Sequence, residues 1–283
     1  MRIDVNGTRL WFDVDGPALV PDGPRMRQRP TVVLVHGGPG GYDHSYFKPH
    51  LGYLTELAQV VYLDLRDHGR SGRHDPTRWS FEVCADDVRA FCDAVGIDRP
   101  VVLGHSLGGF VAILYGARHP GHAAALVLQS TMARFDLDRV TEGFRTVGGD
   151  VVAELARRSY RGDPVTDEEW AKVFAVFGPR VPDPDELARR LGNPDVAGPG
   201  GDRLRELDIV DQLARITCPT LVCVGRLDPI TPVAASEEIM DGLPAGLGRL
   251  EALDGAGHFT WLDQPDRYRS ILTSFLSSAT RTA

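Results

Sequence analysis

The pentapeptide Gly-His-Ser-Leu-Gly at positions 104–108 constrains the fold of this chain more than any other feature. It directly follows the apolar run Val101–Leu103, and a stretch with helical periodicity follows it. A serine between two glycines at a strand-to-helix junction is typical of a nucleophile elbow. Such a turn leaves no room for side chains at Gly104 and Gly108. It would hold Ser106 above the sheet, beside the free N–H groups of the new helix. The alternative is a glycine-rich turn without chemistry.

Continuous apolar runs recur along the chain and predict buried parallel strands. These runs lie at 31–35, 60–63, 101–103, 125–128 and 220–224, with further strands predicted at 9–14 and around 249–253. Helical stripes separate several of the runs, and one of them extends from a Ser80 N-cap to Gly96. Strands that alternate with helices predict an α/β fold, in which helices cover both faces of a mostly parallel sheet.

The alternation stops between residues 132 and 212, where the sequence predicts helices joined by Pro- and Gly-rich segments. We therefore expect a helical cap at 132–212, inserted into an α/β core formed by 1–131 and 213–283. Within the cap, 198–201 is expected to be a flexible joint, and a helix that starts at Asp183 is expected to end near Gly192.

An aromatic stripe marks one predicted cap helix, which starts at a capping box formed by Thr166 and Glu169. The stripe consists of Trp170, Phe174 and Phe177. Such a stripe usually packs against other helices, yet it can also line a substrate pocket if the helix lies over that pocket.

A serine hydroxyl is a weak nucleophile that needs a base, and the base in turn needs an orienting acid. Asp228 lies just beyond the predicted strand 220–224, and His258 lies in a small-residue loop after the strand around 249–253. The chain order Ser, Asp, His is the order found on α/β sheets with a nucleophile elbow. We therefore expect a triad of Ser106, His258 and Asp228. Asp136 is the alternative acid, because it follows the preceding strand.

An anion-binding site is expected beside Ser106, because a tetrahedral intermediate needs two backbone N–H donors. Leu107, the residue after the serine, would supply one donor. The loop His36–Gly40 follows the first core strand and would supply the other. Pro39 has no N–H, so Gly38 is the predicted second donor. His36 is expected to anchor the loop rather than to act as a base.

Charge and composition exclude several classes of protein. A net charge of -8 argues against a nucleic-acid partner. No apolar run is long enough to span a bilayer, and the N-terminus lacks the apolar core of a secretory signal, so we expect a cytoplasmic protein without a membrane partner. The four cysteines lack C-x-x-C spacing and an accompanying His cluster, so we expect no metal site. The predicted chemistry needs no cofactor.

The triad order, the succession of strands and helices, and the cap resemble the α/β-hydrolase superfamily over essentially the whole chain. The segment His-Gly-Gly-Pro-Gly-Gly at 36–41 and the loop Asp-Leu-Arg-Asp-His-Gly-Arg-Ser at 64–71 resemble the prolyl aminopeptidase (proline iminopeptidase) branch. Two positions depart from that branch: Asp67 replaces the usual Gly, and Leu107 stands where Trp is more common. The resemblance implies that cap carboxylates bind a free α-amino group of the substrate.

The sequence thus predicts a serine hydrolase that cleaves a small-molecule ester, lactone or amide through an acyl-enzyme, with prolyl-type amide cleavage as the specific candidate. A general carboxylesterase or lactonase, or another cofactor-free hydrolase with the same triad, is the main alternative. An alternative from a different functional class is a hydrolase-like fold that serves as a small-molecule receptor without catalysis.

Overall fold

An eight-stranded sheet lies at the centre of the molecule, with strand order β1-β2-β6-β5-β7-β8-β9-β10. The computed structural model describes residues 1–279, apart from the side chain of residue 199. The strands of the sheet are β1 (Arg2–Val5), β2 (Thr8–Asp15), β5 (Thr31–Val35), β6 (Gln59–Asp64), β7 (Val101–His105), β8 (Ala125–Gln129), β9 (Thr220–Gly225) and β10 (Gly248–Leu253). Only the pairs β1–β2 and β2–β6 are antiparallel within this described sheet. The predicted mostly parallel sheet is therefore confirmed.

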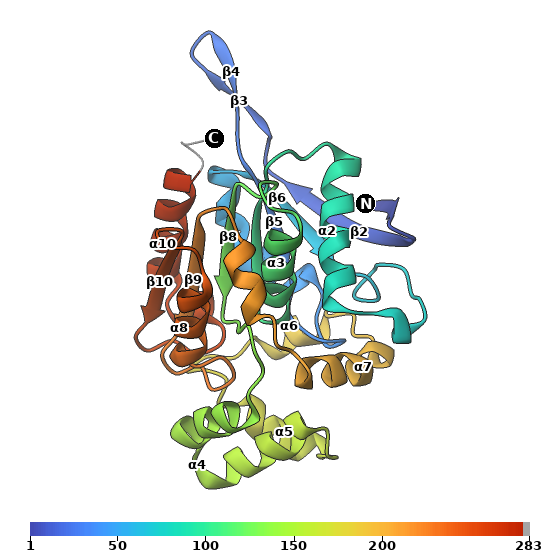
Figure 1. Cartoon of the computed structure of the whole chain (residues 1–283), viewed down its shortest axis with the longest axis vertical. Coiled ribbons are helices and arrows are strands. Elements are labelled where there is room, and N and C mark those ends of the chain that lie inside the picture. The colour runs from blue at the N-terminus through green and yellow to red at the C-terminus, as the bar shows by residue number, and fades with distance from the viewer. Residues whose placement is uncertain (280–283) are drawn as a thin grey trace.

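Helices flank the sheet, and α2 and α3 run side by side across one face of it (Figure 1). The α-helices are α1 (Lys48–Leu51), α2 (Phe81–Val95), α3 (Leu107–Arg118), α4 (Leu137–Arg161), α5 (Asp167–Phe174), α6 (Pro184–Ala188), α7 (Pro194–Arg205), α8 (Val233–Gly242), α9 (Thr260–Asp263) and α10 (Pro265–Ala279). Short 3-10 helices occur at η1 (His44–Tyr46), η2 (Gly52–Glu56), η3 (Pro76–Arg78) and η4 (Val210–Arg215). As predicted, α2 has a Ser80 N-cap and ends at Gly96, whose φ of 70° is left-handed.

The first strand, β1, and a separate hairpin were not predicted from the sequence. The strands β3 (Leu19–Asp22) and β4 (Arg25–Gln28) pair with each other and project from the rest of the molecule (Figure 1). Their residues are exposed or half-buried, so no apolar pattern marks them as strands. None of the helices in the described part of the chain combines the length and apolarity needed to cross a membrane.

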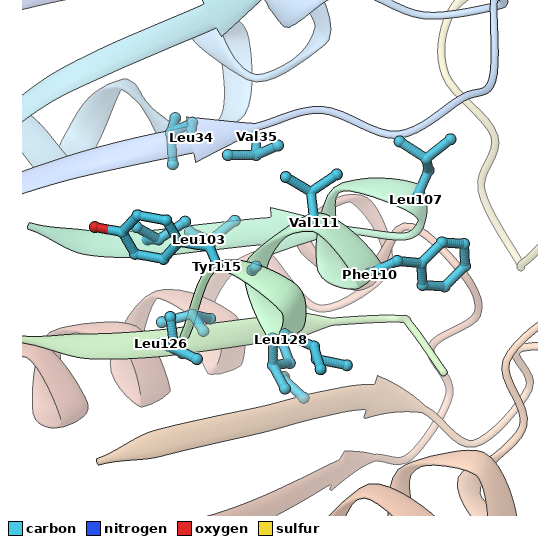
Figure 2. Packing of buried hydrophobic residues seen from close by; sticks show 14 of the residues in the cluster. Leu34, Val35, Leu103, Leu107, Phe110, Val111, Tyr115, Leu126 and Leu128 are labelled. Carbon is cyan, nitrogen blue, oxygen red and sulfur yellow. The ribbon is translucent and has the colours of Figure 1, made fainter. Parts of the chain in front are cut away.

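The helix α3 lies in the middle of the hydrophobic core. Every residue from Leu107 to Ala117 is buried, as expected for a helix that is apolar all round. Figure 2 shows the side chains of Val111 and Tyr115 among those of Leu103 on β7, Leu126 on β8 and Leu34 on β5. The start of α3 is therefore held by the strands on which it packs.

Close backbone packing sets the turn between β7 and α3. A Cβ at Gly104 would lie 2.1 Å from the Gly108 carbonyl oxygen, and a Cβ at Gly108 would lie 2.1 Å from the Val35 carbonyl oxygen. Both distances are far below a van der Waals contact, so only glycine fits at either position. The two glycines thus bring the ends of β5 and β7 and the start of α3 together.

The segment between β8 and β9 contains α4, α5, α6 and α7, and α4 and α5 lie beyond one end of the sheet (Figure 1). Two expectations for this segment were wrong. Residues 198–201 are part of α7 rather than a flexible joint, and the helix that starts after Asp183 ends at Ala188, well before Gly192.

The helical state of 198–201 has a tertiary cause. A Cβ at Gly200 would lie 2.3 Å from the Pro39 Cβ, so α7 packs directly on the loop after β5. Val196, on the same helix, is buried. Gly and Pro disfavour a helix by about 1 and 3 kcal/mol each, and only such packing outweighs that cost.

We predict that Gly108→Ala lowers the free energy of unfolding by about 1–3 kcal/mol or more, because its methyl group overlaps the Val35 carbonyl. Gly52→Ala is the matched control, since a Cβ at Gly52 meets nothing within 4 Å and its φ of -56° suits any residue. Urea unfolding of the two variants checks the prediction. Equal stability of both would contradict the packing argument.

Candidate active site

Ser106 occupies the turn between β7 and α3 in a strained backbone conformation. Its φ of 54° and ψ of -119° lie outside the regions that non-glycine residues usually adopt. The Ser106 N–H donates to the Gln129 carbonyl at 2.9 Å, and the Ser106 carbonyl accepts from Thr131 Oγ1 at 2.8 Å. These bonds to the end of β8 hold the turn, and the serine side chain faces a cavity of about 680 Å³.

His258 lies in the loop between β10 and α9, and its ring also lines this cavity. The His258 Nδ1 donates to Asp228 Oδ2 at 2.9 Å. This bond fixes the tautomer, because it leaves Nε2 of a neutral ring as an acceptor. The structure thus places Ser106 and His258 on one cavity and Asp228 directly behind His258.

Asp228 lies in the loop after β9 and is almost fully buried. Its carboxylate accepts from the Thr231 hydroxyl at 2.6 Å, from the Thr231 N–H at 3.0 Å and from the Ile230 N–H at 2.9 Å. Burial acts to raise the pKa of Asp228, but attraction to His258 and the hydrogen bonds from His258 and Thr231 outweigh it and lower the pKa. The carboxylate therefore stays ionised behind the imidazole. Thr231 was not singled out from the sequence.

The alternative acid, Asp136, has a different role in the structure. Its side chain accepts from the Arg139 N–H at 2.9 Å and thereby caps the N-terminus of α4. Among the described residues, Asp228 is the one recorded hydrogen-bond partner of His258 Nδ1. The geometry favours Asp228 as the partner of His258.

The loop 37–41 runs against Ser106: a Cβ at Gly37 would lie 3.3 Å from the Ser106 Cβ. Three of its N–H groups have partners within the protein. Gly37 donates to Tyr46 Oη at 2.9 Å, Gly40 to His68 Nε2 at 2.9 Å and Gly41 to the Pro39 carbonyl at 2.8 Å. Pro39 has no N–H, so Gly38 carries the loop's free donor among the hydrogen bonds recorded for the described residues. Gly38 also lines the cavity.

Leu107 is the first residue of α3, and an N–H at that position has no acceptor within its own helix. It follows Ser106 directly. Gly38 is next to Gly37, which contacts Ser106, and among the described residues no acceptor is recorded for the N–H of Gly38 or of Leu107, so the two predicted donors stay a prediction that this geometry permits. His36 anchors the loop as expected, because its Nε2 accepts from the Leu65 N–H at 3.1 Å and its Nδ1 donates to the Gly37 carbonyl at 2.6 Å.

His105 connects the three parts of the site, which the sequence analysis did not foresee. The Tyr46 hydroxyl accepts from the Gly37 N–H and donates to His105 Nδ1 at 2.9 Å. His105 Nε2 then donates to the His258 carbonyl at 3.2 Å. Burial lowers the pKa of His105 well below its ordinary value, so the ring stays neutral and keeps this tautomer. Its place inside the pentapeptide is the only sequence signal for it.

A second unforeseen contact joins the segment before α7 to the loop 37–41, the predicted anion-binding loop. The Asn193 N–H donates to the Gly40 carbonyl at 2.6 Å, and the Asn193 side chain donates to the Asp67 carbonyl at 2.8 Å. A Cβ at Gly40 would lie 2.5 Å from the Asn193 carbonyl oxygen. Asp67 has a left-handed φ of 63°, a conformation that glycine adopts more readily than other residues.

The cavity is mostly apolar, and Trp170, Phe174 and Phe177 all line it. The aromatic stripe therefore faces the space next to Ser106. Charged side chains on the described part of the wall are Arg190, Arg205 and Asp167. Several carboxylates of the segment are on outer surfaces and paired with arginines or Lys172, as in the ion pairs of Glu142, Glu154, Glu168, Glu169 and Glu206.

Asp43, His44 and Asp64 are close enough together to share a metal ion. Their donor atoms already form hydrogen bonds within the protein. Asp64 Oδ1 accepts from His44 Nδ1 at 2.6 Å, Asp64 Oδ2 accepts from the Arg70 N–H at 2.8 Å, and Asp43 Oδ2 accepts from the Leu191 N–H at 2.9 Å. The arrangement thus fits a structural cluster that fixes the loops around the site.

A profile described as "alpha/beta hydrolase fold" matches residues 30–265. The chain belongs to the α/β-hydrolase family. This hydrolase is 25% identical to the proline iminopeptidase of Heyndrickxia coagulans, with 98% of each chain covered. It is also 25% identical to 3-oxoadipate enol-lactonase 1 of Acinetobacter baylyi, over 96% of this chain and 94% of the relative. The crystal structure of VinJ superposes with a TM-score of 0.82 at 26% identity, covering 99% of the hydrolase and 98% of that chain. The predicted resemblance to the family and to its proline iminopeptidase branch is confirmed.

We predict that Asp228→Asn lowers kcat of the hydrolase by about 10⁴-fold, because the amide can no longer hold the His258 tautomer and stabilise its cation. Asp136→Asn is the matched control and should keep near wild-type kcat, because Asp136 caps a helix away from the imidazole. Steady-state kinetics on a p-nitrophenyl ester compares the two variants. The reverse ranking would assign the acid to Asp136.

Proposed function

We propose that this hydrolase cleaves a small carboxylic ester or lactone through an acyl-enzyme on Ser106. One observation carries the proposal: a strained elbow serine and an Asp228-oriented His258 line the same apolar cavity, beside the free N–H groups of Gly38 and Leu107. A nucleophile, a base with an orienting acid and two anion donors are the parts that acyl transfer requires.

The proposed reaction has two halves. Ser106 Oγ attacks the carbonyl carbon of the substrate while His258 Nε2 takes the hydroxyl proton, and the N–H groups of Gly38 and Leu107 stabilise the oxyanion. The intermediate collapses, the C–O bond to the leaving group breaks, and His258 gives its proton to the departing oxygen. Water then attacks the acyl-enzyme, with His258 as base, and releases the acid and free Ser106.

The charge of the cavity wall decides between substrate classes. Binding a free ammonium group without a buried partner would cost several kcal/mol in desolvation. The described wall offers two arginines and a single carboxylate, Asp167, which is exposed at the start of α5. This balance of charge favours uncharged or anionic substrates over amines. The segment 132–212 is proposed as the cap that covers the bound substrate.

The second candidate is a prolyl aminopeptidase-like amide hydrolase. It is supported by the proline iminopeptidase relative, which is matched over nearly the whole length of both chains. In that case Asp167 is the residue available to bind the substrate amine. We rank it below the ester or lactone activity because Arg190 and Arg205 lie on the same wall.

We predict that Ser106→Ala lowers kcat by several orders of magnitude, on the order of 10⁴ to 10⁶, with the fold intact. It should also abolish covalent labelling by a fluorophosphonate probe. Ser274→Ala, an exposed position on α10, serves as the control and should label like the wild type. Labelling that persists in Ser106→Ala would refute the assigned nucleophile, and an unlabelled wild type would favour the receptor alternative.

We predict that p-nitrophenyl esters and lactones are hydrolysed with a higher kcat/KM than prolyl-anilide. Comparison of prolyl-anilide with its N-acetylated form measures the effect of the charged substrate amine on kcat/KM, because acetylation removes that charge. Equal rates or a preference for the blocked form are expected from this cavity wall. A strong preference for the free amine would instead establish the aminopeptidase reaction.

A further inference from the structure

Arg190 follows α6 and lines the cavity that contains Ser106. Its guanidinium stacks on the ring of Tyr42, with Cζ 4.2 Å from the ring centroid, and its Nε donates to the Leu187 carbonyl at 3.1 Å. Tyr42 also lines the cavity and directly follows the anion-binding loop. These contacts hold the guanidinium in one plane beside that loop.

Among the described residues, Arg190 is recorded without a carboxylate partner, unlike Arg158 and Arg205. Arg205, the other arginine on the wall, pairs with Asp202, and Arg158 pairs with Glu169 at 3.2 Å. Within residues 1–279, no carboxylate is recorded in an ion pair with Arg190. Arg190 is half-buried, and Asp167 is the lone carboxylate on the described wall.

An unpaired guanidinium in a mostly apolar cavity has a definite chemical preference. Its planar fork presents parallel N–H groups that match a carboxylate, and stacking on an aromatic ring fixes the orientation of the fork. Nε is bonded to the Leu187 carbonyl, and the guanidinium also interacts with the Tyr42 hydroxyl, so the remaining N–H groups of the two Nη atoms are the donors left for a ligand. Water is partly excluded there, which strengthens a charge-assisted hydrogen bond.

We propose that Arg190 determines specificity by binding a carboxylate of the substrate that is separate from the scissile ester or lactone. The natural substrate is then an acidic ester or lactone, such as a half ester of a dicarboxylic acid. This inference rests on the proposed function, because it names the substrate class of the same site.

The kinetic test uses pairs of substrates that differ only in charge. One series places the carboxylate on the acyl side, as mono-p-nitrophenyl esters of dicarboxylic acids with their methyl-capped forms. The other places it on the leaving group, as acetylated hydroxybenzoates with their methyl esters. For at least one spacer, the wild type should prefer the acid by about 10- to 100-fold in kcat/KM.

Variants of Arg190 separate recognition of the substrate carboxylate from a general loss of activity. Arg190→Met should reduce that preference by about tenfold or more, mainly through KM, and Arg190→Lys should restore part of it because the charge returns without the fork. Arg189→Met is the matched control, since Arg189 is exposed and does not line the cavity. The inference is overturned if the wild type shows no preference for the acid at any spacer on either side. It is also overturned if Arg190→Met lowers kcat/KM equally for the acid and for its methyl ester.

A binding measurement keeps this test independent of catalysis. Calorimetry on Ser106→Ala compares monomethyl and dimethyl esters of dicarboxylic acids, and the monoester should bind about tenfold more tightly. The added Arg190→Met change should remove this difference, whereas Arg189→Met should keep it. Equal binding of the two esters overturns the role of Arg190. Failure of the proposed function is recognised separately, by a wild type that a fluorophosphonate does not label.

Discussion

The contact between Gly108 and the Val35 carbonyl is the constraint on which the site depends. Because no side chain separates them, α3 begins directly against the end of β5. The same contact brings the loop 37–41 next to Ser106 and aligns it with the first N–H of α3. A turn with larger residues would move the helix away from the strand, and the two anion donors would no longer lie on either side of the serine. The geometry of the candidate site therefore originates in backbone packing.

The chain of hydrogen bonds through His105 extends this constraint to the base. One buried series of hydrogen bonds runs from Gly37 through Tyr46 and His105 to the His258 carbonyl. Each bond in it fixes the direction of the next. A neutral His105 is required, because Nδ1 must accept from Tyr46 while Nε2 donates. The loops after β5, β7 and β10 are thus held in register by His105, which also lines the cavity.

The parts of this structure that could be predicted from sequence are those set by local pattern. The core strands have apolar runs, the elbow has its glycines, and Asp228 and His258 each follow a strand. The parts that could not be predicted depend on contacts between distant segments. The helix at 198–201 forms against Pro39, despite its Gly and Pro residues. Arg190 looks like its neighbour Arg189 in the sequence, and only the fold places one on the cavity wall and the other in solvent.

The segment 190–193 connects the proposed substrate-binding residue Arg190 to the loop of the proposed oxyanion donor. Its first residue, Arg190, faces the cavity, and its last residue, Asn193, donates its N–H to the Gly40 carbonyl of the anion-binding loop. Gly40 is two residues from the donor at Gly38, and its tight contact with Asn193 leaves the loop little room to shift. An anion bound at Arg190, as proposed, would therefore contact a segment that also packs on the loop of the proposed oxyanion donor Gly38. The proposed ion pair then acts mainly on KM, because it forms in the bound substrate before reaction, and the contact of Asn193 with Gly40 keeps the proposed oxyanion donor in place in the same complex.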